Sequence, residues 1–471
     1  MNLVLFPNQL YDPELLRKRY PDIEQIIFVE DPVFYGDRKG SCTTVQVLKL
    51  NKLRILFCKV LHKKYVETLN VYFKVKHIEI DDLWNNIDYS FLPEDCTIID
   101  PCDLLLMKRL RKYGVQCKVI DNNPSFIFTN QELQEYMKDR QNKHLQHNHF
   151  YNVSKKKLGI LENVPSQDIY NRKQYSKNIE YPKNPYRNVF SEASIWLDAL
   201  TWLNETSPFR SNYGPSKEWK QIINDYLIHL PLTHKDVKVW FNDFIKNRLD
   251  TYGSFQDVVI PDNPLLYHSG LSIYLNNGMI TPSEIVRTVM KQNSPIQNIE
   301  GFVRQVIGWR EYARLYYLYV SSDVYRKNIF GIKKKSLPKK WYTGKTDIPI
   351  VNDTIKYAFN YGYINHIQRL MIMANYMTIN EIHPDNIYKW MYEFSLDSYD
   401  WVMIFNSYSM GSWSDKGHAM RKPYISSSSY VLRMSSAKKG EWTTVWDDKF
   451  KSFIQKNKQI IKHTQLANLV K

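Results

Sequence analysis

Short apolar runs recur along the first quarter of the chain, and each has the length and composition of a buried strand. They occupy residues 2–6, 25–30, 77–82, 97–100 and 118–121. Segments with helical periodicity separate them, the clearest being 47–69 and 103–113, with Gly114 as the stop. This alternation predicts a parallel sheet with right-handed crossovers. We therefore expect an α/β, Rossmann-like domain at 1–124, although no G-x-G-x-x-G sequence follows the first strand.

The pattern then changes twice. Residues 125–187 are polar and rich in Pro and Lys, which is typical of a linker, with one helix expected at 131–142. Residues 188–471 are almost entirely helical in pattern, so we expect a larger all-α domain there. Thr281–Glu284 forms a capping box that starts one of its helices. Two apolar stripes mark others: Val189, Ala193, Trp196, Leu197 and Leu200, and Phe302, Val306, Trp309, Ala313, Tyr316 and Val320.

Composition narrows the class of protein. The net charge of +16 favours a polyanionic partner such as nucleic acid, and the 14% aromatic content favours a site that stacks flat rings. No run of 18 apolar residues or secretory signal is present, so we expect a soluble intracellular protein without a membrane partner. All five cysteines lie at or before Cys117, none in a C-x-x-C pair, which indicates reduced, buried thiols and no metal site.

Two consecutive helical segments hold the candidate chemistry. In 363–379, His366 and Arg369 are three residues apart and therefore neighbours on the helix surface. In 385–400, opened by Pro384 and Asp385, the carboxylate of Asp397 falls within an apolar stripe formed with Trp390, Phe394 and Trp401. A buried carboxylate needs a partner, and Arg369 is the candidate. The residues alone leave open a purely structural salt bridge and a purely structural histidine.

Several blocks resemble the photolyase/cryptochrome superfamily. The block 301–312, GFVRQVIGWREY, is similar to its RQ-x-x-GWRE motif. HIQRLM at 366–371, KPYI at 422–425 and YVLRMS at 430–435 resemble the prokaryotic (6-4) photolyase branch, whose members carry an iron–sulfur cluster. The likeness extends from about Leu3 to Ser435 with the blocks in order. It implies an α/β antenna-type domain followed by a helical domain that binds FAD.

The resemblance assigns roles to individual residues. Arg369 and Asp397 match an ion pair beside the flavin ring, and the two serines of 266–272 match its phosphate ligands. The implied cofactor-binding set is Gly253, Phe255, His268, Ser269, Leu271, Ser272, Arg369, Asp397 and Asn406. Trp390 and Trp341 match an electron-transfer chain, with ordinary core packing as the alternative. Gln9 and Glu30 are candidates for contact with a lumazine-type or other antenna chromophore, a site that could also be empty.

The implied partner is UV-damaged DNA, bound by a monomer. His366 and Tyr424 match catalytic residues, because repair of a (6-4) lesion moves a proton between bases, which a histidine can do. Gln305, Trp309 and Arg310 match residues that support or contact the flipped lesion.

The chain also departs from that branch. No cysteine follows Cys117, so the branch's cluster ligands are missing from the region after Ser435 and from near Ile350. We therefore expect no iron–sulfur cluster, and expect Trp442 and Trp446 to pack that end instead. Asn365 replaces the first histidine of the usual pair, Met391 stands where an aromatic is common, and 6–10 differ from the usual antenna-site sequence.

The leading prediction is a (6-4) photolyase that uses reduced FAD as electron donor. Three alternatives remain at this point: a cryptochrome-type blue-light photoreceptor, a cyclobutane pyrimidine dimer photolyase, and a non-catalytic nucleic-acid-binding protein with a vestigial flavin pocket. The last would have lost Arg369 or Asp397, and both are present.

Overall fold

The computed structural model describes residues 1–41, 43–140, 144–260, 263 and 265–470. The chain forms two compact units. The first, here the sheet unit, contains 1–139, 185–243 and 270–288, and the second, the helical unit, contains 140–184, 244–269 and 289–471. These units are grouped by contacts and combine separate stretches of sequence. The domain boundaries expected near residues 124 and 187 therefore stay a prediction.

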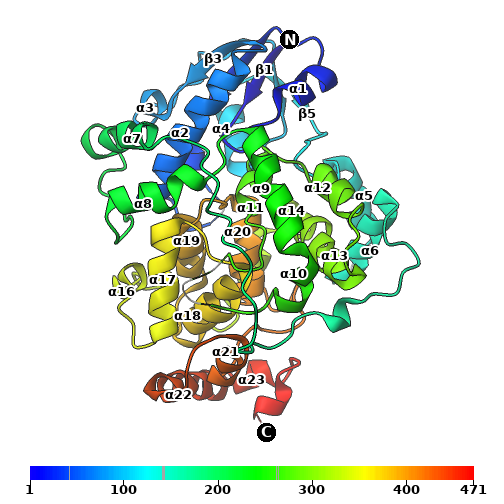
Figure 1. Ribbon diagram of the computed structural model, residues 1–471, viewed down its shortest axis with the longest axis vertical. Helices are drawn as coiled ribbons and strands as arrows, with labels where there is room; N and C mark the ends of the chain where they lie inside the picture. Colours follow the sequence, from blue (N-terminus) through cyan, green and yellow to red (C-terminus); the bar gives the residue numbers. More distant parts are fainter. Residues whose placement is uncertain (42, 141–143, 261–262, 264, 471) are drawn as a thin grey trace. The chain divides into compact units, whose positions relative to one another are not determined.

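The sheet unit is built on a five-stranded parallel sheet of order β3-β2-β1-β4-β5, which confirms the predicted α/β, Rossmann-like fold (Figure 1). Its strands are β1 (Asn2–Leu5), β2 (Gln25–Val29), β3 (Lys74–Ile78), β4 (Cys96–Ile99) and β5 (Cys117–Ile120). The central strands are buried, while the edge strands β3 and β5 keep exposed residues. This difference follows from the sequence, since only the central strands are continuous apolar runs.

One strand was predicted in the wrong place. The third lies at Lys74–Ile78 and not at 77–82, because Asp81 and Asp82 fall in the short helix α3 (Ile80–Leu83). The predicted helix 47–69 is shorter, since Asn51 caps α2 (Lys52–Leu69) by accepting a hydrogen bond from the Leu53 N–H. Asp103 likewise caps α4 (Leu104–Lys112), as the sequence indicated.

Further helices complete the sheet unit. They are α1 (Pro13–Arg19), η1 (Pro32–Tyr35), α5 (Asn130–Asp139), α7 (Ala193–Glu205), α8 (Trp219–Asp225), η3 (Leu227–His229) and α11 (Ser272–Asn276). Two more, α9 (His234–Asn247) and α12 (Pro282–Val289), run across the sequence boundaries of the units. The helix expected at 131–142 corresponds to α5, and residues 141 and 142 lie outside the described residues.

The apolar stripe predicted around α7 is wrong in register. Trp196, Ala199 and Leu203 are buried, whereas Val189 and Leu197 are exposed. Helix α7 lies beside α2 (Figure 1), where Trp196 stacks on Phe57 with ring centroids 6.5 Å apart. The predicted capping of α12 is confirmed, since the Glu284 N–H donates to Thr281 Oγ1 at 3.2 Å.

The helical unit is the all-α part of the molecule. Its α-helices are α6 (His147–Leu158), α10 (Leu249–Phe255), α13 (Ile296–Val303), α14 (Arg310–Tyr319), α15 (Ser322–Tyr325), α16 (Lys340–Thr343), α17 (Pro349–Tyr361), α18 (Asn375–Ile379), α19 (Pro384–Phe394), α20 (Asp400–Ile404), α21 (Ser428–Met434), α22 (Glu441–Lys456) and α23 (Lys458–Ile461). Short 3₁₀ turns occur at η2 (Asp168–Tyr170) and η7 (Ala467–Val470).

Three segments of this unit are wound as π-helix, namely η4 (Arg304–Trp309), η5 (Gln368–Ala374) and η6 (Phe405–Gly411). Such segments are uncommon and are found frequently at functional sites. Each contains or adjoins residues singled out from the sequence: Trp309 in η4, Arg369 in η5 and Asn406 in η6.

Most of the cysteines are free thiols of the kind predicted. Cys96 and Cys102 are buried, while Cys58 and Cys117 are half-buried, and Cys42 lies outside the described residues. Burial raises the pKa of Cys58 and of Cys96 to about 11. Within the described residues, no helix has the length and apolar character that crossing a membrane requires.

Candidate active site

The candidate site begins at a capped helix start. Asn365 and Gln368 form a reciprocal capping box, in which Asn365 Oδ1 accepts from the Gln368 N–H at 3.0 Å and Gln368 Oε1 accepts from the Asn365 N–H at 3.2 Å. The helical stretch starts at His366 and continues through η5. Asn365, which replaces a histidine of the related branch, therefore fixes the position at which His366 enters the helix.

Arg369 and Asp397 form the ion pair that the sequence predicts. Arg369 Nη1 and Nη2 donate to the two oxygens of Asp397 at 2.9 and 3.1 Å, the fork geometry of a strong charge-assisted pair. Arg369 Nε donates to the Ile364 carbonyl at 2.9 Å, and Ser395 bonds both partners. Both side chains are largely buried, so each charge depends on the other.

The local structure around Asp397 differs from the prediction. Helix α19 ends at Phe394, so Asp397 lies in the connection to α20 and not on one helix with Trp390. His383, and not Pro384, is the N-cap, since its side chain accepts from the Asp385 N–H. The apolar surroundings are as predicted: Trp390, Phe394 and Trp401 are buried, and the Arg369 guanidinium lies 5.3 Å from the Phe394 ring centroid.

Two histidines lie near this pair, and both are held neutral at pH 7. Burial, with Arg369 as second cause, lowers the pKa of His366 to about 4. Burial, followed by the proximity of His366, lowers the pKa of His268 to about 4. The His366 ring nevertheless has an exposed accessible surface. A ligand can therefore reach this ring.

Polar atoms without a protein partner lie in the same region. His268 Nε2 and Gln368 Nε2 are buried and make no hydrogen bond within the part of the chain that the structure describes. Such atoms destabilise a fold by about 1–3 kcal/mol each unless a ligand or water binds them. Gln368 Nε2 is an amide donor beside the Arg–Asp pair and suits a carbonyl or phosphate oxygen. The neutral His268 ring donates to the Gln256 backbone, which leaves Nε2 as an acceptor for a hydroxyl group. The residues present therefore fit FAD.

The other cofactor candidates have more varied surroundings. Gly253 lies within α10, where an added Cβ would collide with Asn171, so packing alone explains a glycine there. Phe255 stacks on Tyr267 at 4.9 Å. Asn406 Nδ2 donates to the Val402 carbonyl at 2.9 Å within its own helix. Ser269 belongs to the helical unit, and Leu271 and Ser272 to the sheet unit, so their joint role at a phosphate stays a prediction.

The GWRE block forms an aromatic cluster with α6. The Trp309 ring stacks on His147, with centroids 3.6 Å apart and planes 10° from parallel. Gly308 permits this approach, since a Cβ there would lie 2.9 Å from His147 Nε2. Arg310 is buried, with its guanidinium 4.8 Å from the Trp401 ring centroid, and Gln305 Nε2 donates weakly to Gln256 at 3.4 Å. Contact of these residues with a lesion stays a prediction.

Tyr424 lies in a different electrostatic neighbourhood. Burial raises its pKa, and the nearby charges are those of Arg172 and Asp257. Burial also raises the pKa of Asp257 to about 6, although Arg172 opposes the shift. No contact brings Tyr424 together with His366 among the described residues, so their cooperation as a catalytic pair stays a prediction.

A line of aromatic residues leads from Asp397's neighbourhood toward α22. Phe394 packs on Trp390 at 4.7 Å, and Trp390 Nε1 donates to the Trp341 carbonyl at 2.7 Å. Trp341 is 5.9 Å from Tyr376, whose ring is 4.7 Å from Trp446. Trp390 and Trp341 are both fully buried. The predicted tryptophans are thus connected, which suits either core packing or electron transfer.

The C-terminal end is held as the missing cysteines led us to expect. Trp446 is buried in α22 and its Nε1 donates to the Ser426 carbonyl at 3.0 Å. Trp442 packs edge-on against Trp446 at 6.3 Å. These two indoles lie within α22 itself, where they pack its inner face.

In the sheet unit, the antenna candidates are buried and hydrogen-bonded within the protein. Gln9 Nε2 donates to the Ile99 carbonyl at 2.8 Å. Glu30 accepts from His62 at 2.9 Å and from the Ile80 N–H at 3.0 Å. Their contact with an antenna chromophore stays a prediction, and the geometry gives both a structural role.

Sequence reasoning missed several residues of the site. His147 lies in the predicted linker, 162 positions before Trp309 in sequence, and Arg248, buried near Tyr363, carries no motif. Asp257 and Arg172 likewise come from separate segments. No periodic or motif signal could have found them, because each approaches the site from a loop or helix far along the chain.

Comparison with known proteins gives the site its context. The family model for deoxyribodipyrimidine photo-lyase-related proteins matches residues 3–219. A (6-4) photolyase of Agrobacterium fabrum is 29% identical over 334 residues, 69% of this chain and 62% of that protein. The match therefore spans less than two thirds of that relative's length.

Solved structures share the fold. A cryptochrome of Synechocystis sp. PCC6803 aligns with a TM-score of 0.56 at 12% identity, covering 98% of this chain and 88% of that one. A class III photolyase from Agrobacterium tumefaciens aligns with a TM-score of 0.55 at 14% identity, covering 98% and 86%. The chain is therefore similar in part of its sequence to photolyase-related proteins and in its fold to photolyases and cryptochromes.

Proposed function

We propose that this protein is a light-dependent DNA repair enzyme, a (6-4) photolyase with FAD as its cofactor. The observation that carries the proposal is the placement of His366, an exposed neutral imidazole, three residues before the buried Arg369–Asp397 pair on one helical stretch. The likeness to a (6-4) photolyase supports the choice of lesion.

In this proposal Arg369, Asp397 and His268 hold the cofactor, and the fork of the ion pair orients Arg369. Reduced FAD, when bound, supplies the photoexcited electron for repair. The buried pair and its apolar neighbours Phe394 and Trp390 exclude water from that side of the site. Exclusion of water strengthens every electrostatic interaction within it.

His366 moves the proton. A neutral imidazole has one ring nitrogen that donates and one that accepts a hydrogen bond, so it can take a proton from one base and return it to another. Its pKa of about 4 makes it a weak base in the free protein. A negative charge brought beside it by lesion and cofactor would raise that pKa toward neutrality.

Recognition of the damaged DNA involves the charge of the whole chain as well as residues near the lesion. The net charge of +16 provides long-range attraction to the phosphate backbone. Tyr424, Gln305, Trp309 and Arg310 are the residues proposed to lie at or behind the extruded lesion. The buried Arg310 would act by supporting Trp401 and not by direct contact.

The test is repair under blue light by protein saturated with FAD. Oligonucleotides with a single (6-4) photoproduct or a single cyclobutane dimer are irradiated and analysed by chromatography. We expect repair of the first, and a loss of about 10²–10⁴-fold in the His366→Ala variant with flavin retained. His229→Ala is the matched control, because the ring of this half-buried histidine bonds the Asn188 carbonyl and His229 is not a candidate site residue. Repair of the cyclobutane dimer alone would contradict the choice of lesion.

A photoreceptor of cryptochrome type is the second candidate. The aromatic line from Trp390 to Trp446 favours it, because such a line can carry electrons to a photoexcited flavin. Flavin photoreduction without repair of either lesion would establish this function in place of the first.

A further inference from the structure

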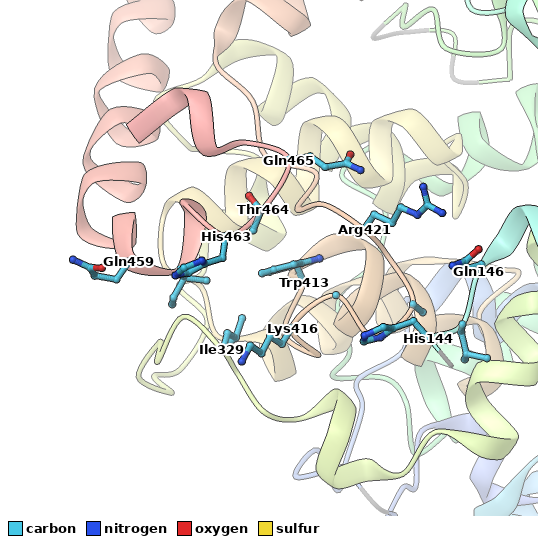
Figure 2. A pocket seen from close by; sticks show the side chains of 14 residues that line it. His144, Gln146, Ile329, Trp413, Lys416, Arg421, Gln459, His463, Thr464 and Gln465 are labelled. Atoms are coloured by element: carbon cyan, nitrogen blue, oxygen red, sulfur yellow. The ribbon is translucent and has the colours of Figure 1, made fainter. Parts of the chain in front are cut away.

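A cavity of the helical unit lies apart from the Arg369–Asp397 site. Its volume is about 550 Å³. Three segments that are distant in sequence line it together with Ile329: 144–146 before α6, the loop 413–421 after η6, and 459–465 at and after α23. Figure 2 shows Trp413 among the lining side chains, with Arg421 and His144 on one side of it and His463 on the other.

The cavity lining has one sign of charge. Lys416 and Arg421 are exposed, and neither pairs with a carboxylate among the residues that the structure describes. No Asp or Glu is found among the described residues that line the cavity. The acid nearest in sequence, Asp415, is buried and accepts hydrogen bonds from Tyr316 Oη at 2.9 Å and the Gly417 N–H at 3.0 Å. The lining therefore suits an anion.

The loop that carries the cations is rigidly built. Trp413 and Lys416 both adopt positive φ, 50° and 60°, which is uncommon for residues with a side chain. Gly417 packs on the Trp413 ring, where a Cβ would lie 2.8 Å from the indole, and Trp413 Nε1 donates to the Met420 carbonyl at 2.8 Å. Backbone conformations of this kind cluster at ligand-binding sites, because the surrounding structure must enforce them. The surrounding structure thus holds the backbone at Lys416 in this conformation.

The uncharged residues of the lining indicate that the ligand also has apolar and hydrogen-bonding parts. The lining also includes the apolar side chains of Ile329, Ile460 and Trp413, here called the apolar floor. Three amides, those of Gln146, Gln459 and Gln465, can both donate and accept. The volume is in the range of small-molecule sites and far larger than a phosphate ion needs. An anion with a flat, hydrogen-bonding ring fits all three features.

We propose that this cavity binds a nucleotide, with its phosphate on Lys416 and Arg421 and its base over the apolar floor. The nucleotide can come from a DNA strand or be free in solution, since both present the same chemistry. This site is independent of the repair reaction, and the proposal stands whether or not the chain repairs DNA.

The test measures binding to the full-length chain, with and without saturating FAD. The probes are methylanthraniloyl-AMP and a labelled pentathymidylate, followed by fluorescence anisotropy, with unlabelled AMP and inorganic phosphate as competitors. K416Q/R421Q is the test variant. K449Q/K451Q is the matched control, because it removes two exposed lysines of α22 outside the cavity. Thermal melting confirms that both variants fold.

We expect both probes or one of them to bind, and K416Q/R421Q to weaken binding at least about tenfold, with little change in K449Q/K451Q. Tighter binding of pentathymidylate than of AMP would identify a DNA strand as the source, and the reverse would identify a free nucleotide. Equal affinity in the two double variants, or no binding, would overturn the proposal. Displacement by phosphate as effective as by AMP would also overturn it, because the site would then recognise the anion alone.

Discussion

Two histidine clusters, one in each compact unit, differ in what their polar atoms contact. In the sheet unit, buried Glu30 bonds His62 at 2.9 Å, His77 at 3.4 Å and the Ile80 N–H at 3.0 Å. In the helical unit, His366 and His268 lie beside arginines, and burial lowers the pKa of each to about 4. In the first cluster, the carboxylate of Glu30 has hydrogen-bond partners within the cluster. The second holds neutral imidazoles, and His268 Nε2 has no hydrogen-bond partner among the described residues.

The contrast teaches how a structural network can be told from a candidate site. A carboxylate surrounded by donors becomes a stable anion: burial raises the pKa of Glu30, but His62 and His77 lower it by more. Imidazoles without an acidic partner are costly in the empty protein and useful once a ligand arrives. The substitutions below each disrupt one of the two clusters.

The largest effect is expected from Arg369→Ala. This change leaves Asp397 buried without its partner, which destabilises a protein by about 3–5 kcal/mol. We expect loss of bound flavin, measured by absorbance after gel filtration, and a clear drop in the unfolding midpoint in urea. Arg369→Lys keeps the charge but loses the fork, so an intermediate flavin content is expected. Full flavin content in the alanine variant would contradict the role of the pair.

Glu30→Gln tests the other cluster. The buried amide keeps the shape but loses the charge that His62 and His77 contact, which is expected to destabilise the sheet unit by about 1–3 kcal/mol. Urea unfolding measures the loss. Flavin content and repair per folded molecule should not change, and a selective loss of either would show that Glu30 serves the chemistry.

The fold was largely predictable because its signals are local. Short apolar runs identified four of the five strands, and the crossover rule then fixed a parallel sheet. The third strand was misplaced because β3 is an edge strand whose residues Lys74, Lys76 and His77 carry no apolar run. The buried face of α7 was predicted in the wrong register because α7 is rich in apolar residues, so several registers fit its sequence equally well.

The site was predictable only in part. Arg369 and Asp397 could be paired because a buried carboxylate demands a cation and Asp397 was expected within an apolar stripe. The stack of His147 on Trp309 and the pairing of Arg172 with Asp257 depend on the folded path of a segment that has no periodicity. The capping role of Asn365 agrees with the sequence N-x-x-Q, which has the spacing of a capping box.

The pH dependence of stability distinguishes the two histidine clusters without a mutation. His366 and His268 have pKa values lowered to about 4 from an ordinary 6.5, so the folded state binds fewer protons than the unfolded chain between these values. Stability is therefore full above pH 6.5 and falls as the pH drops toward 4. The lowered pKa of Glu30 has its effect only below about pH 4.5.

Melting temperatures measured from pH 7.5 to 4.5 check this order. We expect a decline over that range in the wild type and a shallower decline in His268→Gln, which removes one buried titrating group. Glu30→Gln should follow the wild-type slope down to pH 4.5. The prediction would be contradicted if the decline of the melting temperature with pH changed in Glu30→Gln and not in His268→Gln. The acid sensitivity would then belong to the Glu30 cluster.

The smallest effect is expected from Asn365→Ala, which alters only the entry of His366 into its helix. The variant loses the bond from the Gln368 N–H to Asn365 Oδ1, and an N-cap of this kind stabilises a protein by about 1 kcal/mol. Asn365→Asp, which keeps an acceptor at the same position, is the matched control. If the cap positions His366, alanine should also slow repair at unchanged flavin content, whereas aspartate should not. Equal repair rates in the two variants, with only the melting temperature altered, would limit Asn365 to stabilising the helix.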